Sequence, residues 1–346
     1  MRIYDFGPSF PRESPLINNV YRALVVILLT LVAVSANPIV PVSAFDPSTL
    51  SAVAPSGRLI FAAESGGVWN LFAADANGGA WQRLSANAAP ARDPAISPDG
   101  KTIAFRSRRD GFWEIYSMPA NGGSPMRLTR GMVYSGAPVW SPDNKRLAFE
   151  SYKHGDLDIW AMNADGTQPV NLTETSEFQD YAPAWSPDGK WIAYTSWQTG
   201  TQQIFVVAAD CTVGCKAFNV SQNKADDEEP AWSPDGKQLT FVSDRDGQRA
   251  IYTADFALAG LKNIKRITFS GWDDQPAWSP DGKWIAFVSA RPTRQPLYIT
   301  SAEGGIPRIV DDSDMYAASV AWAPDATVVL DAPNESAGAP LYQARP

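Results

Sequence analysis

A seven-residue block recurs along the chain at a nearly constant spacing. The sequence Ala-Trp-Ser-Pro-Asp-Gly-Lys occurs three times letter for letter, and looser copies precede and follow it. Counting a degenerate first copy, the blocks lie at residues 53–58, 95–101, 139–145, 184–190, 231–237, 277–283 and 321–326. A period of 20 to 50 residues marks an array of supersecondary units that bury their cores against one another. This repeat therefore constrains the fold more than any other feature.

Each unit is expected to contain four short β-strands. In the unit that starts at residue 139, the block leads into apolar runs at 147–149, 159–162 and 171–173. These runs are short, rich in β-branched and aromatic residues, and bounded by turn formers, which is typical of strands. Asp165–Gly166 separates the last two, and this dipeptide favours a tight hairpin. No helical periodicity appears after residue 45.

Four strands in a unit of about 44 residues is the pattern of a β-propeller blade. The sequence therefore predicts an all-β fold, a β-propeller of four-stranded antiparallel blades, as one domain over residues 37–346. We predict seven blades, the last closed by both chain ends, with residues 39–44 as an outer strand. Proline is tolerated there because an outer strand is an edge strand. A six-bladed ring is the alternative.

The recurring signature Trp-Ser-Pro-Asp-Gly-Lys, followed by Ile-Ala-Phe and Ile-Tyr, resembles the TolB-like β-propeller repeat, a WD40-like Pro-Asp repeat. The resemblance covers roughly residues 50–346. It implies a propeller, six blades being typical of the family, and a role in binding envelope partners. TolB also has an α/β domain before its propeller, and the resemblance does not extend to such a domain here.

Residues 23–34 form a twelve-residue apolar run that follows Arg22. This length fits the apolar region of a signal peptide and is short of the roughly 20 residues of a membrane-spanning helix. We expect residues 1–36 to be a signal peptide, with cleavage after Ala36 or Ala44, or alternatively an uncleaved N-terminal anchor. The protein is then exported, and is periplasmic, on the cell surface or secreted.

Export determines whether the two cysteines can form a disulfide. Cys211 and Cys215 are close in sequence, and an oxidising compartment permits a disulfide between them. Two free thiols in an inserted loop are the alternative reading.

The rare residue types exclude several kinds of site. A single histidine, His154, and two cysteines cannot build a histidine-cluster or cysteine-rich zinc centre. A net charge of −8 argues against non-specific nucleic-acid binding, which requires Lys and Arg to neutralise phosphates. No Gly-x-Ser-x-Gly motif is present. We therefore expect no cofactor, no bound metal and no catalysis, in a protein that is a monomer.

In a propeller, the segments before the innermost strands and the loops between second and third strands gather on one face, around the channel mouth. Loops that vary between blades are where function is expected. The candidate partner-binding residues there are Asp180, Tyr181, Trp197, Asp227, Glu228, Arg245, Trp272, Asp273 and Arg291. An ordinary rim in which acids and arginines pair with each other is the alternative.

The predicted function is a non-catalytic, protein- or ligand-binding scaffold of the cell envelope, whose partner is an envelope protein or peptide. Contact with a membrane is expected only through the N-terminal segment. The alternatives are a lectin or a carbohydrate-active enzyme, a glycoside hydrolase or lyase, that uses carboxylates such as Asp227 and Asp273. The repeated tryptophans of the block are expected to pack between blades rather than to stack on sugars.

Overall fold

The computed structural model describes residues 58–65, 68–75, 82–85, 89–131, 134–153, 155–174, 178–289, 297–311, 320–322 and 328–332. All of them belong to the second of two units into which the chain divides, Leu50–Pro346. The expected signal segment, the expected strand at 39–44, His154 and Arg291 lie outside the described residues. Within those residues, no helix has the length and apolar character to span a membrane.

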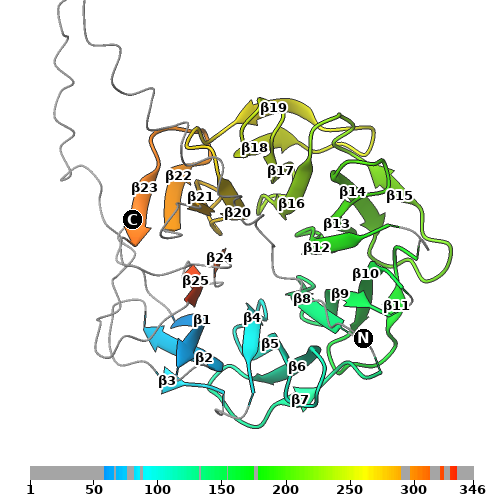
Figure 1. The fold of residues 1–346 in the computed structure, drawn as a ribbon, viewed down its shortest axis with the longest axis vertical. Helices are drawn as coiled ribbons and strands as arrows, with labels where there is room; N and C mark the ends of the chain where they lie inside the picture. Colours follow the sequence, from blue (N-terminus) through cyan, green and yellow to red (C-terminus); the bar gives the residue numbers. More distant parts are fainter. Residues whose placement is uncertain are drawn as a thin grey trace, which may run out of the picture. The chain divides into compact units, whose positions relative to one another are not determined.

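Five sheets contain four antiparallel strands each, and neighbours in sequence are neighbours in the sheet. The strands are β4 (Ala91–Ile96), β5 (Thr102–Ser107), β6 (Glu114–Pro119) and β7 (Met126–Arg127); β8 (Tyr134–Trp140), β9 (Arg146–Tyr152), β10 (Leu157–Asn163) and β11 (Val170–Asn171); β12 (Asp180–Trp185), β13 (Trp191–Ser196), β14 (Gln203–Ala208) and β15 (Ala217–Asn219); β16 (Asp227–Trp232), β17 (Gln238–Ser243), β18 (Ala250–Asp255) and β19 (Lys262–Arg266); and β20 (Asp273–Trp278), β21 (Trp284–Ser289), β22 (Leu297–Ser301) and β23 (Arg308–Asp311). The first strand of each sheet lies nearest the central axis of this unit, and the fourth lies outermost (Figure 1). Each of these innermost strands ends at the second residue of the repeated block, and the Ser-Pro-Asp residues follow it.

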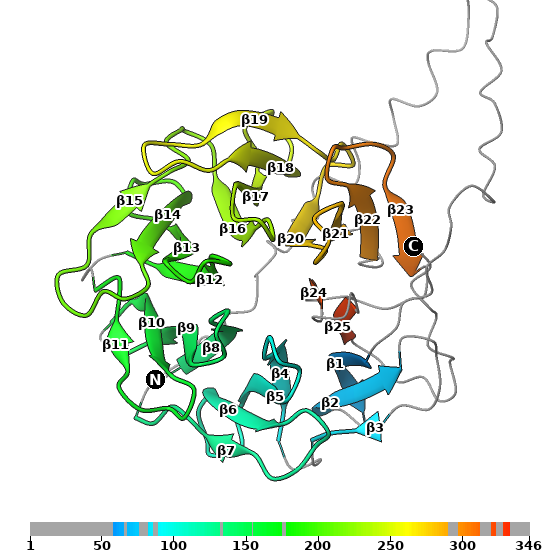
Figure 2. The same ribbon diagram turned by 180° about the vertical axis from the view of Figure 1, so that it is seen from behind.

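The remaining sheet has five strands and joins the two ends of the repeat array. Its order is β24 (Val320–Trp322), β25 (Val328–Ala332), β1 (Arg58–Ser65), β2 (Val68–Asp75) and β3 (Gln82–Arg83). The strands β1 and β25 run parallel, with Ala62 opposite Asp331. Viewed from behind in Figure 2, the early strands β1 to β3 again lie beside the late strands β24 and β25.

The prediction of seven blades is wrong, and so is the alternative of six four-stranded blades. The structure has five four-stranded antiparallel blades, and the sixth sheet has five strands with one parallel pair. The physical reason is that the first and last repeats, counted separately from the sequence, each supply only part of this one sheet. Joining the chain ends in a single sheet leaves fewer exposed strand edges.

The core consists of clusters that lie between adjacent blades. One cluster combines Ala104 and Ile115 of the β4–β7 blade with Leu147 and Phe149 of the next. The tryptophans of the block reach across the same boundaries. The indole Nε1 of Trp232 donates to the carbonyl of Ala184 at 3.1 Å, in the preceding blade. These rings therefore act as structural links between blades, in agreement with the sequence interpretation.

The Pro-Asp-Gly segments form the turns between first and second strands. In one of them, Oδ1 of Asp188 accepts hydrogen bonds from the Ser186 hydroxyl at 2.7 Å and from the Lys190 amide at 3.1 Å. These bonds to Ser186 and Lys190 lower the pKa of Asp188. The same arrangement recurs at Asp99, Asp143, Asp235 and Asp281. The repeated aspartates are therefore turn residues, and this end of the blades is here called the turn face.

Candidate functional site

The other end of the blades carries the predicted site and is here called the mouth face. It consists of the described residues of the loops between second and third strands, and of the segments that lead into innermost strands. The loops are residues 108–113, 153, 155–156, 197–202 and 244–249, and Tyr152 at the end of β9 is counted with them. The segments are residues 84–85, 89–90, 128–131, 172–174, 178–179, 220–226 and 267–272. Register pairs such as Asp180 with Ser196 and Asp227 with Ser243 mark the strand ends on this face.

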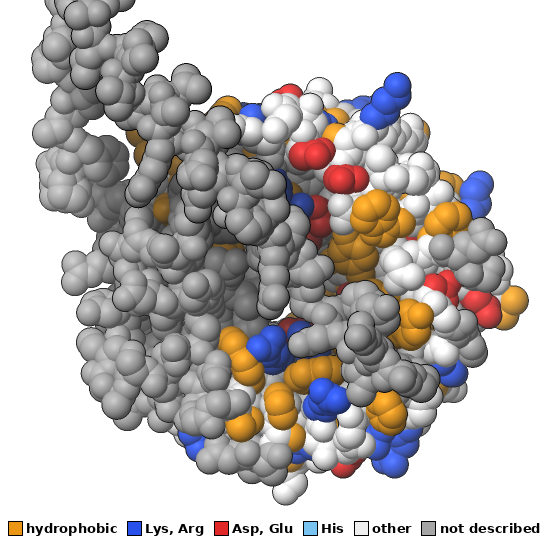
Figure 3. Space-filling model, in the orientation of Figure 1, with side chains coloured by type: hydrophobic (Ala, Val, Ile, Leu, Met, Phe, Trp, Pro, Cys, Tyr) orange, Lys and Arg blue, Asp and Glu red, His pale blue; other side chains and the backbone are white. Residues whose placement is uncertain are grey.

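All large aromatic side chains that are exposed in the described residues lie on the mouth face. They are Phe112, Tyr152, Trp197, Phe269 and Trp272. The most exposed are Phe269 at 69% and Trp272 at 61%. The exposed large side chains outside this face, such as Val213 and Ile306, are aliphatic or Met, and these two lie in turn-face loops. Figure 3 draws one face of the molecule, on which hydrophobic side chains lie among charged ones.

The backbone at Trp272 is in an unusual conformation. Its φ is 151°, a region that side chains other than glycine rarely adopt. The residue follows Gly271 and immediately precedes β20, so the chain turns sharply where it enters the innermost strand. Strained backbone conformations cluster at functional sites, which makes Trp272 a candidate binding residue.

Two of the predicted acids, Asp227 and Asp273, are fully buried. Nη2 of Arg245 donates to Oδ1 of Asp227 at 2.9 Å, and the Asn223 amide also donates to this carboxylate. The carboxylate of Asp273 accepts the Ser270 hydroxyl at 2.6 and 2.7 Å. Both acids are therefore engaged by side chains of their own blade.

Glu228 is the centre of a network that joins three blades. Its carboxylate accepts hydrogen bonds from Arg249, from the Tyr181 hydroxyl at 3.4 Å and from Nε2 of Gln202 at 3.2 Å. Nε of the same Arg249 lies 2.5 Å from Oδ1 of Asp274 in the next blade. Burial raises the pKa of Glu228, and the nearby Arg249 opposes this rise. The acids and arginines of this sector therefore pair with each other.

A β-bulge interrupts every four-stranded blade's innermost strand just before a proline. The residue ahead of each proline has a positive φ of 44 to 55°; these residues are Asp93, Ala137, Ala182, Glu229 and Gln275. The backbone amides of all but Asp93 donate to the preceding blade: that of Gln275 donates to Glu229 at 2.7 Å, and that of Ala182 donates to Glu150 at 3.2 Å. Proline cannot donate to a ladder, which explains the bulge.

Two carboxyls near the innermost strands, that of the buried Asp180 and that of the half-buried Glu229, have strongly perturbed pKa values. Burial raises the pKa of Glu229 to about 8, and the negative charges of Asp274 and Glu228 add to the rise. Burial also raises the pKa of Asp180 to about 7, with further contributions from Asp158 and Asp156. Asp180 occupies the position that Asp227 has in the β16–β19 blade, but Gln198 stands where that blade has Arg245.

The structure thus separates the predicted residues into groups. Trp197 and Trp272 are exposed, Tyr181 and Glu228 belong to the inter-blade network, and Asp180 is buried. Sequence reasoning missed Arg249, Phe112 and Phe269. Arg249 immediately precedes the third strand of its blade, at the position that Trp113 and Gln202 have in other blades. This variation between blades is the sequence signal that could have identified it.

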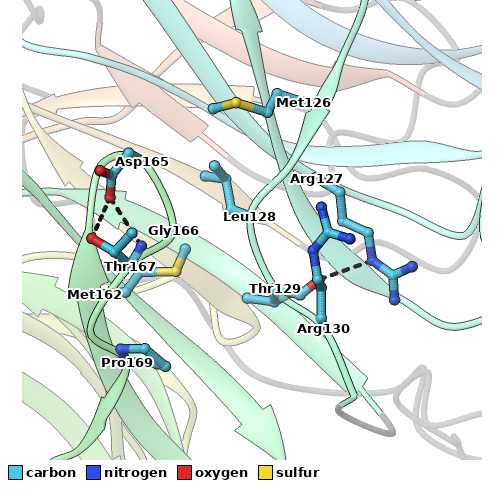
Figure 4. A pocket seen from close by; sticks show the side chains of 10 residues that line it. All are labelled: Met126, Arg127, Leu128, Thr129, Arg130, Met162, Asp165, Gly166, Thr167 and Pro169. Atoms are coloured by element: carbon cyan, nitrogen blue, oxygen red, sulfur yellow. Dashed lines mark hydrogen bonds between the residues drawn. The ribbon is translucent and has the colours of Figure 1, made fainter.

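The cysteine-containing loop and a pocket between two neighbouring blades contain none of the exposed aromatic side chains of the mouth face. The sulfurs of Cys211 and Cys215 are bonded, in the turn-face loop between β14 and β15. The pocket in Figure 4 lies between the β7 segment and the β10–β11 hairpin, lined by residues that include Met126, Met162 and Pro169. No predicted site residue lines this pocket. Among the described residues, no group of three or more His, Cys, Asp or Glu side chains is arranged to hold a metal ion.

Comparison with solved structures shows the same fold. TolB from Acinetobacter baumannii is 24% identical, with a TM-score of 0.60 over 72% of this chain and 62% of that protein. A putative TolB from Agrobacterium tumefaciens is 22% identical, with a TM-score of 0.61 over 73% of this chain and 93% of that one. A puromycin-hydrolyzing peptidase from Mycobacterium tuberculosis is 15% identical, with a TM-score of 0.57 over 77% of this chain and 47% of the peptidase.

The chain therefore spans less than two thirds of the Acinetobacter protein and of the peptidase. A search among curated proteins gives no match. The sequence model of the TolB beta propeller domain matches residues 129–216 and 212–336, which together make up more than half of the chain. With this match, the repeated block and the radial four-stranded sheets, the chain belongs to the TolB β-propeller domain family.

Proposed function

We propose that this protein is an exported, non-catalytic scaffold that binds a protein or peptide of the cell envelope on its mouth face. The observation that carries the proposal is the gathering of Phe112, Tyr152, Trp197, Phe269 and Trp272 on that one face. Aromatic and arginine side chains are the usual anchors of protein interfaces, within a polar rim. A partner that covers these rings removes apolar surface from water, which contributes a favourable free energy of about 25 cal/mol per Å² of apolar surface buried.

The pairing of the predicted acids supports binding rather than catalysis. The glycosidase alternative needs ionisable carboxyls that face a substrate. Asp227 is engaged by Arg245 and Asp273 by Ser270, and both acids are buried.

The envelope location rests on the sequence and on the family. The apolar segment at residues 23–34 supports export, and the similar solved structures include two TolB proteins. Export is tested directly by N-terminal sequencing of the protein recovered from its native host. A mature chain that begins at residue 37 or 45 is expected, and an intact N-terminus in the cytoplasmic fraction would contradict export.

The binding proposal is tested by affinity capture from native envelope extract. The immobilised wild-type protein is compared with the double variant Phe269→Ala and Trp272→Ala, and captured proteins are identified by mass spectrometry. The double variant Val213→Ala and Ile306→Ala is a matched control, because it removes exposed apolar side chains from the turn face. We expect one partner to be enriched by the wild type and the control and lost with the mouth-face variant. Equal capture by all three would refute the assignment.

A further inference from the structure

The repeat supplies an internal comparison between two blades. In the β16–β19 blade, the guanidinium of Arg245 lies 5.0 Å from the ring centres of Phe241 and Tyr252. Its Nε donates to the Ser243 hydroxyl at 3.0 Å, and its Nη2 donates to Asp227 at 2.9 Å. The arginine is thus oriented by two rings and a serine, and its remaining donor edge is filled by a carboxylate.

Arg109 has the same surroundings in the β4–β7 blade. Its guanidinium lies 4.8 Å from the ring centre of Tyr116 and 5.6 Å from that of Phe105, and its Nε is 3.3 Å from the Ser107 hydroxyl. Ser107 pairs with Ala91 in register, just as Ser243 pairs with Asp227. Alanine therefore stands where the other blade has the carboxylate.

In the described part of the chain, no hydrogen bond or ion pair reaches Nη1 or Nη2 of Arg109. Asp110, whose charge acts on Arg109, and Glu114 are hydrogen-bonded to other groups of this blade. Asp110 accepts the Tyr116 hydroxyl at 2.6 Å and lies 3.5 Å from Arg127. Glu114 is buried and pairs with the same Arg127 at 2.7 Å. In the β16–β19 blade, Asp246 likewise accepts the Tyr252 hydroxyl and neighbours Arg266, so the two blades differ mainly at the missing aspartate and at Glu114.

Arg109 is also partly withdrawn from water, and this desolvation lowers its pKa. This guanidinium has lost part of its hydration and has no carboxylate hydrogen-bonded to it. Binding a carboxylate would be favourable, because a charge-assisted, bidentate hydrogen bond would replace the lost water. Its neighbours in the same loop are suited to an interface: Arg108 is an exposed second cation, and Phe112 is an exposed aromatic.

We propose that Arg109 is a carboxylate-binding position of the mouth face, at which a carboxylate of the bound protein partner takes the role that Asp227 has for Arg245. Ala91 is itself buried, so the carboxylate reaches the guanidinium from its solvent side. The inference rests on the proposed function in that the carboxylate belongs to a partner on this face. It adds that the partner presents an acidic group next to Phe112.

The test uses the full chain and three short probes: acetyl-Gly-Asp-Gly-amide, acetyl-Gly-Gly-Gly with a free carboxy terminus, and acetyl-Gly-Asn-Gly-amide. The measurement is the NMR signal of each arginine Nε–H during titration. We expect a saturable shift of the Arg109 signal with one or both carboxylate peptides and none with the Asn peptide. A response to the Asp peptide alone identifies a side-chain carboxylate, and a response to the free terminus alone identifies a chain end. No shift of Arg109 with either, or an equal shift with the Asn peptide, would overturn the proposal.

A substitution can place a carboxylate beside Arg109 within the protein itself. Ala91→Asp is expected to weaken peptide binding at Arg109 at least tenfold, while Ala91→Asn, of similar size and uncharged, retains it. Arg109→Gln is the second variant, and it adds no acid to a buried position. Because it removes the Arg109 signal, binding is followed on the Nε–H of the neighbouring Arg108, whose response to the carboxylate peptides should be lost. Binding that survives both Ala91→Asp and Arg109→Gln would overturn the assignment. These titrations need no partner, so their failure is distinguishable from failure of the envelope capture.

Discussion

Asp227 and Arg245 form a buried ion pair that joins the start of β16 to the loop after β17. Their atoms lie 2.9 Å apart, and the side chains are 0% and 18% exposed. The pair closes the mouth-face end of this blade, and the Arg245 guanidinium lies over two aromatic rings of the same sheet. Residues that sequence reasoning assigns to a partner therefore hold the blade together.

Breaking this pair should destabilise the protein strongly. Asp227→Ala leaves the Arg245 charge partly buried without its partner, and we expect a loss of about 3–5 kcal/mol in the free energy of unfolding. The control is Lys237→Gln, which removes an exposed pair with Asp235 and should change stability by less than about 1 kcal/mol. Chemical denaturation measures both. Similar losses for the two variants would show that burial of the first pair is unimportant.

Stability should fall as the pH rises from about 5 to 8. The pKa of Asp180 is raised to about 7 and that of Glu229 to about 8, both chiefly by burial. Between the ordinary carboxyl pKa and these values, the folded state binds more protons than the unfolded state, so deprotonation favours unfolding. Each such proton changes the free energy of unfolding by about 1.4 kcal/mol per pH unit. Denaturation at several pH values checks the slope, which Asp180→Asn should reduce; a stability that rises with pH over this range would contradict the assignment.

The comparison of the β12–β15 and β16–β19 blades predicts that a cation can be introduced beside Asp180. Gln198→Arg places an arginine at the position of Arg245, and its positive charge should lower the pKa of Asp180 from about 7 toward the ordinary range. Gln198→Met is the uncharged control of similar length. A carbon-13 NMR titration of the Asp180 carboxyl measures the change directly. If both variants leave the midpoint where it is, the two blades are not equivalent at this position.

Gly166 is required where the β10–β11 hairpin meets the neighbouring blade. Its φ is 86°, and an added Cβ would lie 2.7 Å from the Leu128 carbonyl oxygen. Gly189 has a similar φ of 75° but open space around it. We expect Gly189→Ala to cost about 1–2 kcal/mol from backbone strain alone, and Gly166→Ala about 1–3 kcal/mol more from the clash. Thermal unfolding of the two variants tests this difference, and equal melting temperatures would rule out the clash.

The sequence predicts the local structure of this protein well, and it also predicts that the two chain ends share one sheet. It does not predict the number of blades or which strands pair where the ends meet. Strands such as 147–149 and 159–162 lie within β9 and β10, because a run of apolar residues between turn formers has few other options. The sixth sheet depends on the parallel pairing of β1 with β25, two strands some 270 residues apart, and no local pattern encodes this contact. The repeat therefore predicts the four-stranded blade correctly and the number of blades wrongly.

On the mouth face, too, the sequence predicts some features and not others. That Trp272 and Trp197 lie on it follows from their place before and between strands, and both are exposed. Whether an acid there is free or paired depends on side chains from other segments. Asp227 and Glu228 are adjacent in sequence, yet one is held by Arg245 within its blade and the other by Arg249, which also binds the next blade.

Site-specific photo-crosslinking in the native host tests the central claim that the mouth face binds a partner. The photoreactive residue p-benzoylphenylalanine is placed at Phe112 or Trp272 on the mouth face, and at Val213 or Ile306 on the turn face. We predict a covalent adduct of one common mass from the two mouth-face positions and none from the two turn-face positions. Adducts from the turn face alone, or no adduct from either mouth-face position, would contradict the account.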